Sequence, residues 1–193
     1  MRLQHYGLIG SLVLVTWSAS ARAGTTAFVG GYVINNGYAS PLTGFTIQAS
    51  TPQVGVGLLM GFDLVNKGGG SQVELGVLYM PRGFVEVLND QSTITVSQTT
   101  LQVPLLFRIP IIPAVSVGLG GFLSYALSST SNLNAAMDYG FVGSAALKFG
   151  FSKAIDILVD VRYQFGLTNL SSVPGFGTYF YDLQGLVGVV LGF

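Results

Sequence analysis

The sequence contains no cysteine, and its single histidine, His5, lies within the first 23 residues. The lack of cysteine excludes disulfides, lipid attachment to a cysteine and thiol chemistry. Once the first 23 residues are removed, no histidine remains for Ser-His-Asp hydrolysis, Cys-His catalysis or an imidazole metal site. We therefore predict a non-enzymatic protein with no catalytic residue, no cofactor-binding residue, no metal site and no cofactor.

Charge is also scarce. Only 8% of the residues are charged, whereas 50% are hydrophobic and the mean hydropathy is +0.60. Ordinary soluble domains carry about 25% charged residues. The few lysines and arginines also argue against a nucleic-acid partner. The composition therefore favours a membrane protein.

The first 23 residues have the pattern of a secretory signal peptide. Arg2 precedes an apolar segment at residues 7–15, and Ala21-Arg22-Ala23 is a small-x-small cleavage site. The alternative is an N-terminal membrane anchor, but the apolar segment is shorter than the roughly 20 residues that a spanning helix needs. We predict a signal peptide at 1–23 and a mature domain at 24–193, with six basic residues against eight acidic ones, a net charge of −2.

Strict alternation of apolar residues with polar or small ones is the strongest structural signal in the sequence. Residues 179–193 show it most clearly. From Tyr181 onward, every second residue to Phe193 is apolar, whereas the intervening set is polar, small or mixed. Successive side chains of a strand point to opposite faces, so the segment has one apolar and one more polar face. In lipid, only a closed barrel satisfies the backbone hydrogen bonds of such strands.

Seven further segments repeat this pattern, with connections that are alternately long and short, as in outer-membrane barrels. We predict an all-β fold, an eight-stranded antiparallel transmembrane β-barrel of up-and-down topology. The alternative is a transmembrane helix over residues 109–137, which prolines, glycines and a period of two disfavour. The predicted strands are 26–35, 53–64, 71–82, 99–109, 114–127, 137–149, 155–167 and 179–193.

Charges and aromatics support this assignment. All the charges on predicted strands share the proposed inner face, whereas a charge facing lipid at mid-depth would cost about 2–4 kcal/mol. Outward aromatics gather at strand ends, as interfacial girdles do. The ten inner charges are Asp63, Glu74, Arg82, Arg108, Asp138, Lys148, Asp156, Asp160, Arg162 and Asp182. The girdles are Phe62, Phe107, Phe149 and Phe193 at the periplasmic end, and Tyr79, Tyr125, Tyr139, Phe141, Tyr163, Phe165 and Tyr181 at the other.

The inner charges should pair, because an unpaired buried charge is costly. On adjacent strands we expect Glu74 with Arg108, and Arg162 with Asp182. Asp156 and Asp160 share one strand face, where an acid/base pair is one interpretation. The favoured interpretation is that they neutralise Lys148 and Arg162.

Three segments resemble the PorT-like outer-membrane β-barrel family, which has the general build of OmpX-type barrels. They are residues 73–79 (Val-Glu-Leu-Gly-Val-Leu-Tyr), 101–108 (Leu-Gln-Val-Pro-Leu-Leu-Phe-Arg) and 161–169 (Val-Arg-Tyr-Gln-Phe-Gly-Leu-Thr-Asn). The resemblance covers most of the mature chain. It implies an eight-stranded barrel and no shared catalytic residues or substrate.

Two functional hypotheses remain open. The first is a structural or surface-interaction barrel, integral to the outer membrane of a Gram-negative bacterium and filled by its inner charges. The second is a small transport or lipophile-binding barrel with a narrow channel or a side opening, where Gly143, Ala145 and Gly185 thin the wall. In either case we expect a monomer whose partners are outer-membrane lipid and, during assembly, the insertion machinery. The sequence does not name an extracellular partner.

Overall fold

The computed structural model describes residues 24–40, 45–49, 52–64, 70–88, 93–129, 136–152, 155–171 and 177–192. The predicted signal peptide lies outside the described residues. Within these ranges, no helix is long and apolar enough to cross a membrane. The strands are β1 Gly24–Ser40, β2 Phe45–Ala49, β3 Gln53–Asp63, β4 Gln72–Leu88, β5 Thr93–Ile112, β6 Val115–Ser129, β7 Met137–Gly150, β8 Ile155–Gly166 and β9 Gly177–Gly192.

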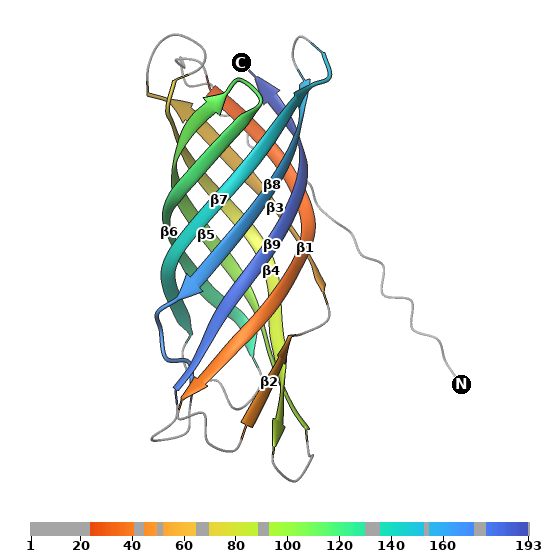
Figure 1. The fold of residues 1–193 in the computed structure, drawn as a ribbon, viewed down its shortest axis with the longest axis vertical. Helices are drawn as coiled ribbons and strands as arrows, with labels where there is room; N and C mark the ends of the chain where they lie inside the picture. Colours follow the sequence, from red (N-terminus) through yellow and green to blue (C-terminus); the bar gives the residue numbers. More distant parts are fainter. Residues whose placement is uncertain are drawn as a thin grey trace, which may run out of the picture.

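Eight of these strands form one antiparallel sheet that closes on itself (Figure 1). The order is β4-β3-β1-β9-β8-β7-β6-β5, and β5 pairs back with β4. Each strand thus has a hydrogen-bonded neighbour on both sides, as lipid requires. The predicted eight-stranded barrel is confirmed, and the helical alternative for residues 109–137 is wrong, because β6 occupies most of that segment.

The remaining strand, β2, lies outside the barrel wall. It pairs with the last five residues of β4, from Phe45 opposite Leu88 to Ala49 opposite Phe84. The same part of β4 pairs on its other edge with the start of β5, from Phe84 opposite Val96 to Val87 opposite Thr93. These three segments, which we call the projecting ribbon, extend beyond one end of the barrel (Figure 1).

Two predicted connections are therefore wrong in part. β1 continues to Ser40 and β2 forms within the predicted loop at 36–52, while β4 and β5 extend into the predicted connection at 83–98. Glu86 consequently lies on β4 rather than in a loop. The local composition favours turns, but pairing with β9, β4 and β5 satisfies these backbone groups and decides in favour of strands. The prediction that residues 93–96 extend a strand is confirmed, since they begin β5.

The predicted turn at 110–113 is also displaced. β5 runs through Pro110 to Ile112, and the turn falls at Pro113–Ala114. The pairing of β5 with β6 shifts register between Pro110 and Ile112. Proline has no N–H to donate to the ladder, so it is tolerated at such an irregularity near the strand end.

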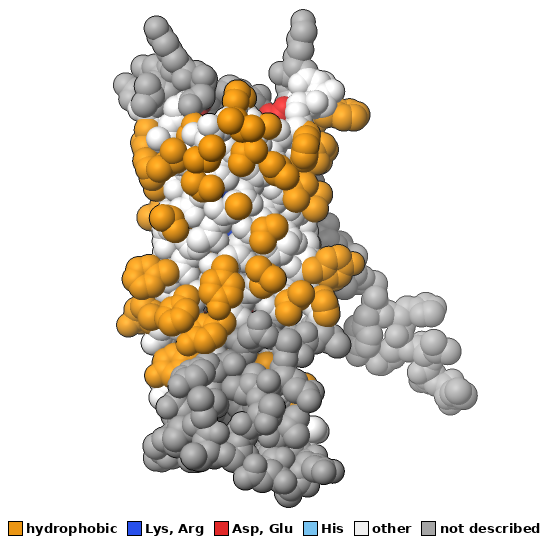
Figure 2. Space-filling view, in the orientation of Figure 1, with side chains coloured by type: hydrophobic (Ala, Val, Ile, Leu, Met, Phe, Trp, Pro, Cys, Tyr) orange, Lys and Arg blue, Asp and Glu red, His pale blue; other side chains and the backbone are white. Residues whose placement is uncertain are grey.

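The two faces of each strand separate as predicted. On β8, Val161 is 50% exposed, whereas the flanking Asp160 and Arg162 are 0% exposed. Figure 2 shows hydrophobic side chains over the barrel wall in view, with almost no charged side chain among them. With no free strand edge and an apolar exterior, the barrel suits a surrounding of lipid rather than water.

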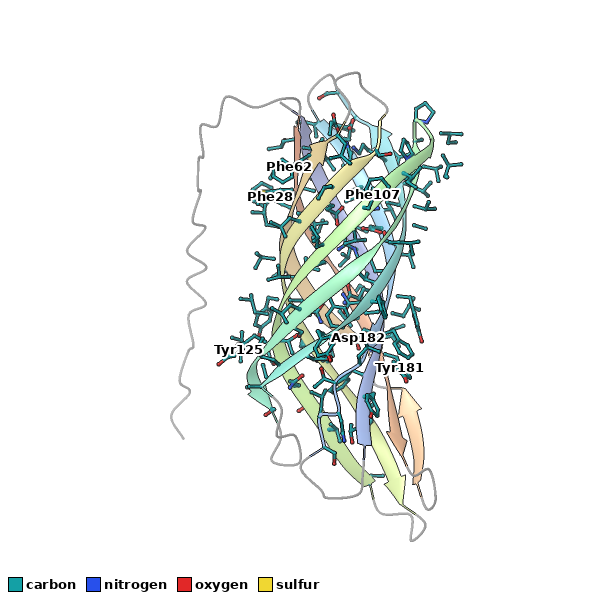
Figure 3. All side chains as sticks on the ribbon, turned by 90° about the vertical axis from the view of Figure 1, so that its left-hand side faces the viewer. Phe28, Phe62, Phe107, Tyr125, Tyr181 and Asp182 are labelled. Carbon is teal, nitrogen blue, oxygen red and sulfur yellow. The ribbon has the colours of Figure 1, made fainter. Side chains whose placement is uncertain are left out.

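Aromatic side chains mark both ends of this exterior (Figure 3). Phe28, Phe62 and Phe107 lie toward one end, and Tyr125 and Tyr181 toward the other. The first end also holds the short turns between strands, which face the periplasm in outer-membrane barrels. The predicted girdles are confirmed for these residues and gain Phe28, while Phe193 lies outside the described residues.

The closing seam between β1 and β9 depends on a glycine. A Cβ on Gly31 would lie 1.9 Å from the carbonyl oxygen of Gly185, so any side chain there would force the strands apart. Gly31 thus permits a close approach of two backbones. The Gly30-Gly31 pair hides the alternation of β1 in the sequence, yet Ala27, Val29 and Val33 all point into the core.

Candidate functional site: the barrel interior

Four charged side chains, Glu74, Arg108, Asp160 and Arg162, form a closed ring inside the barrel, which we call the charge ring. Arg108 donates from Nε to Glu74 Oε2 at 2.6 Å and from Nη2 to Asp160 Oδ2 at 2.5 Å. Arg162 donates from Nη2 to Glu74 Oε1 and to Asp160 Oδ2, both at 2.7 Å. Charges of opposite sign therefore alternate around the ring.

The charge ring is buried and nearly self-sufficient. Asp160 and Arg162 are 0% exposed, and Glu74 and Arg108 are 6% and 5% exposed. Ser144 on β7 donates a further hydrogen bond to Asp160 Oδ1. Two guanidinium groups balance two carboxylates, so the ring has no net charge. Removal of one member would leave the ring with a net buried charge, which typically costs about 3–5 kcal/mol.

A second group of polar side chains lies nearer the extracellular end, and we call it the Arg82 cluster. Arg82 on β4 donates to Asp138 at 2.9 Å, to Asp182 at 3.5 Å, and to Gln98 Oε1 from both Nε and Nη2. Arg82 is 1% exposed. Eight residues separate Glu74 from Arg82 along β4, about 26 Å of extended chain, so the two groups occupy different levels of the barrel.

Glutamines Gln102, Gln164 and Gln184 lie buried on the inner faces of β5, β8 and β9. Gln184 donates to the side-chain oxygen of Gln102 at 3.2 Å. Both side-chain polar atoms of Gln164 have no partner among the described residues. Buried groups of this kind are usually satisfied by ordered water.

An apolar cluster closes the interior beyond the Arg82 cluster. It consists of Phe84, Val96, Leu170 and Phe180, none of which is more than 3% exposed. The rings of Phe84 and Phe180 meet edge to face at 5.4 Å, and the Arg82 guanidinium lies 4.4 Å from the centre of the Phe180 ring. Leu170 comes from the β8–β9 connection, where its N–H bonds to Thr178 O. We call these four residues the apolar plug.

The predicted inner face is confirmed for the charges that form these networks, but the predicted pairs are only partly right. Glu74 pairs with Arg108 and Asp160 with Arg162, as expected. The predicted Arg162–Asp182 pair is wrong, because Arg162 lies opposite Gln184 in the register of β8 with β9. Asp182 instead bonds to Arg82.

The two remaining predicted partners stay outside the networks. Among the described residues, no ion pair joins Asp156 to Lys148, whose nearest register partner on β8 is Leu158. Asp156 lies opposite Gly150, at the periplasmic end of β8. The predicted neutralisation of Lys148 by Asp156 is therefore not seen.

Sequence reasoning placed Arg82 on the inner face but gave it no partner. Gln98 lies directly opposite Arg82 in the register of β4 with β5, whereas Asp138 on β7 and Asp182 on β9 reach it only across the closed barrel. Alternation of side chains shows that these residues share the interior. It does not show which level of the barrel each one reaches.

The contacts of the Glu74 and Asp160 carboxylates fit a structural role in the barrel interior. Each oxygen of Glu74 accepts from an arginine, and both oxygens of Asp160 also accept hydrogen bonds. All four of these oxygens are therefore engaged in ion pairs or hydrogen bonds within the barrel. Among the described residues, no group of three or more His, Cys, Asp or Glu side chains could hold a metal ion.

No protein-family model and no curated protein matches the sequence. Solved structures match in fold. The outer membrane protein OprG from Pseudomonas aeruginosa is 14% identical, with a TM-score of 0.57 over 90% of this chain and 97% of that one. Ail of Yersinia pestis, in complex with the heparin analogue sucrose octasulfate, is 16% identical, with a TM-score of 0.44 over 86% and 98%. The outer membrane protease OmpT from Escherichia coli is 8% identical, with a TM-score of 0.45 over 93% and 99%.

The likeness to OprG shows the fold. The chain is a small outer-membrane β-barrel. Its apolar exterior and closed sheet agree with an integral location in the outer membrane of a Gram-negative bacterium. The resemblance to the PorT-like family is not confirmed by a family match and stays a prediction. The absence of enzymatic activity also stays a prediction.

Proposed function

We propose that the protein is a non-enzymatic, monomeric outer-membrane barrel with a structural or surface-interaction role. The barrel acts as a sealed scaffold, and the projecting ribbon presents the interacting surface. The resemblance of three segments to the PorT-like family agrees with this role, because that family shares a barrel but no catalytic residues. Every barrel strand is paired on both sides, so assembly needs no second copy to cover an edge.

The observation that carries the proposal is the filled interior. The charge ring spans the lumen toward the periplasmic end, and the Arg82 cluster spans it toward the extracellular end. The apolar plug then covers Arg82. Eight-stranded barrels have interiors just wide enough for side chains to fill. A solute would have to break buried ion pairs to pass.

The projecting ribbon supports the surface role. It continues the sheet beyond the apolar exterior, at the end opposite the periplasmic turns (Figure 1). Its base is anchored by Phe84 and Val96, whose side chains enter the apolar plug. A ribbon held at its base and directed away from the membrane can contact a partner without disturbing the barrel.

Single-channel recording in planar lipid bilayers tests the sealed-scaffold proposal. We expect no unitary conductance steps from the purified, refolded protein, whereas a general porin reconstituted in parallel should give steps. Removal of the plug and of Arg82, as in Phe180→Ala with Arg82→Ala, should produce or increase conductance. Steady unitary steps from the unaltered protein would favour the transport alternative instead.

The second candidate is a lipophile-binding or transport barrel, and it rests on small outward side chains in the barrel wall. A Cβ added to Gly185 would meet no atom within 4 Å, and one on Gly143 would meet only Leu119 at 3.8 Å. Ala145 lies opposite Val161, which in turn lies opposite Gly185. We infer that these small outward residues of β7 and β9, which flank Val161 of β8, leave room for a lipid chain against the wall. Replacement of Gly185 by Leu should then weaken binding of a spin-labelled lipid, and unchanged binding would remove this candidate.

A further inference from the structure

A cavity of about 170 Å³ lies inside the periplasmic end of the barrel, next to the charge ring. Its lining includes the exposed turn residues Pro113 and Ala114, so the cavity reaches the protein surface. An engineered cavity of about 150 Å³ holds benzene, so this one can hold a compound of about six non-hydrogen atoms. The charge ring and the sealed interior lie beyond it.

Arg108 brings a positive charge to one wall of the cavity. Arg108 lines it and is 5% exposed, and its Nε and Nη2 donate to Glu74 and Asp160. Its third nitrogen, Nη1, is buried and has no hydrogen-bond partner among the described residues. A buried guanidinium nitrogen without an acceptor is costly. Nη1 is closed off from the cavity as well as from solvent, so Arg108 contributes its positive charge, and not a hydrogen bond, to a ligand there.

Lys148 adds a second positive charge to the same cavity. It lines the cavity from the inner face of β7, and no ion pair ties it to another described residue. Its backbone is fixed by the hydrogen bond from its N–H to Ala114 O at 2.8 Å. Glu74 is the cavity's acidic lining residue, and both its oxygens already accept from arginines. The lining therefore carries two positive charges and one negative charge, a net of +1.

Carboxylates also lie near this end of the barrel, outside the lining. Asp63 accepts a hydrogen bond from Gln72, and Asp156 lies at the start of β8. Neither lines the cavity, so a bound anion would face Arg108 and Lys148 more closely than these acids.

The opposite wall of the cavity is apolar. It is formed by Ala27, Leu59, Ala146, Leu158 and Val190, all of them at most 7% exposed. A fully hydrated inorganic ion would gain nothing from this wall. A ligand with a negative head and a short hydrocarbon tail would satisfy both walls at once.

We propose that this cavity is a binding site for a short-chain aliphatic carboxylate presented from the periplasm. The carboxylate lies against the Lys148 ammonium, in the positive field of the Arg108 guanidinium, and the hydrocarbon tail lies against Leu59, Leu158 and Val190. This site goes beyond the proposed function. It does not depend on whether the barrel conducts, because the ligand enters and leaves at the same end.

Isothermal titration calorimetry of the refolded protein in detergent micelles tests the site, with butyrate as the probe and titration into empty micelles as the blank. We expect saturable binding of one butyrate per chain. Butyramide has the same shape without the charge and should show no saturable binding. Inorganic phosphate, which lacks the tail, should bind more weakly than butyrate.

Two variants of Lys148 give a matched comparison, because this residue lies outside the charge ring. Lys148→Met removes the charge at similar length and should weaken butyrate binding by about tenfold, as expected for a lost charged hydrogen bond. Lys148→Arg keeps the charge and should stay within about threefold of the unaltered protein. Ala146→Leu, which fills the cavity without changing its charge, should also weaken binding. Gel mobility of unheated samples shows that each variant is folded.

Several outcomes would overturn the proposal. They are the absence of saturable butyrate binding, equal binding of butyrate and butyramide, or an unchanged affinity in Lys148→Met. Phosphate binding as tight as butyrate binding would overturn the assignment to an aliphatic ligand.

Discussion

Glu74 and Arg162 form an ion pair across the full width of the barrel, with Arg162 Nη2 2.7 Å from Glu74 Oε1. Their strands, β4 and β8, lie on opposite walls, because three strands separate them in either direction around the sheet. The two residues are 88 positions apart in the sequence. This contact ties the two walls together at the level of the charge ring.

The first prediction concerns this pair. Arg162→Met should reduce the free energy of unfolding by about 3–5 kcal/mol, because it leaves Glu74 and Asp160 buried with fewer donors. The measurement is urea unfolding in lipid vesicles, followed by gel mobility of unheated samples. Glu74→Gln serves as the second single variant and retains the size of the side chain.

The double variant completes the cycle. If the pair is direct, Arg162→Met with Glu74→Gln should lose less than the two single losses added together, by about 0.5–3 kcal/mol. Strictly additive losses would contradict a direct contact across the lumen.

The second prediction tests the face assignment on β8. Leu158 is 7% exposed and inward, whereas its neighbour Val159 points outward. Arginine at Val159 should cost about 2–4 kcal/mol, because neither water nor a counter-charge reaches it at mid-depth. Arginine at Leu158 should carry a smaller charge penalty, because Leu158 lines the cavity that opens at the periplasmic end, although crowding adds about 1–3 kcal/mol.

Methionine variants at both positions separate size from charge. The charge-specific penalty is the loss with arginine minus the loss with methionine, measured by urea unfolding in vesicles. A larger charge-specific penalty at Leu158 than at Val159 would mean that the register of β8 is off by one residue.

The third prediction concerns the projecting ribbon. Replacement of residues 86–94 by Asn-Gly joins Val85 to Thr95 through a two-residue turn, which suits this antiparallel pair. The barrel should still insert, and its free energy of unfolding should change by about 1 kcal/mol or less. Loss of heat-modifiable gel mobility in this variant would show that the ribbon is part of the folding unit.

The fourth prediction concerns assembly. Phe193 ends an alternating segment, and terminal aromatic residues of this kind resemble the recognition signal for the outer-membrane insertion machinery. Deletion of Phe193 should reduce insertion in cells more than it reduces the stability of protein refolded in detergent. Equal losses in the two assays would mean that Phe193 acts only through packing.

The fifth prediction concerns the leader. Ala21-Arg22-Ala23 predicts cleavage before Gly24. Mass spectrometry of protein purified from membranes should find a chain that starts at Gly24 or within a few residues of it. A chain that retains residues 1–15 would support the membrane-anchor alternative.

The inward or outward direction of most side chains in the barrel wall could be predicted, because alternation along a strand is a local property. Val161 faces out and Arg162 faces in, whatever the neighbouring strands do, and lipid tolerates the first but not the second. The same rule placed Glu74, Arg82 and Asp138 inside before any partner was known. The sequence has no cysteine and no histidine after His5. This limits the available chemistry, and the limit can be stated without knowledge of the fold.

The ion pairs across the barrel interior could not be predicted without the tertiary structure. Strand tilt and barrel closure set the level that each inner side chain reaches, so Arg162 meets Glu74 on the opposite wall rather than Asp182 on the adjacent strand. Pairing also turns residues 45–49 and 84–88 into strands, because these two segments bond to each other and the second also bonds to β5. Alternation along each strand thus determined which side chains face inward and which face outward. The contacts among the inward side chains depend on distances across the interior, which only the closed sheet defines.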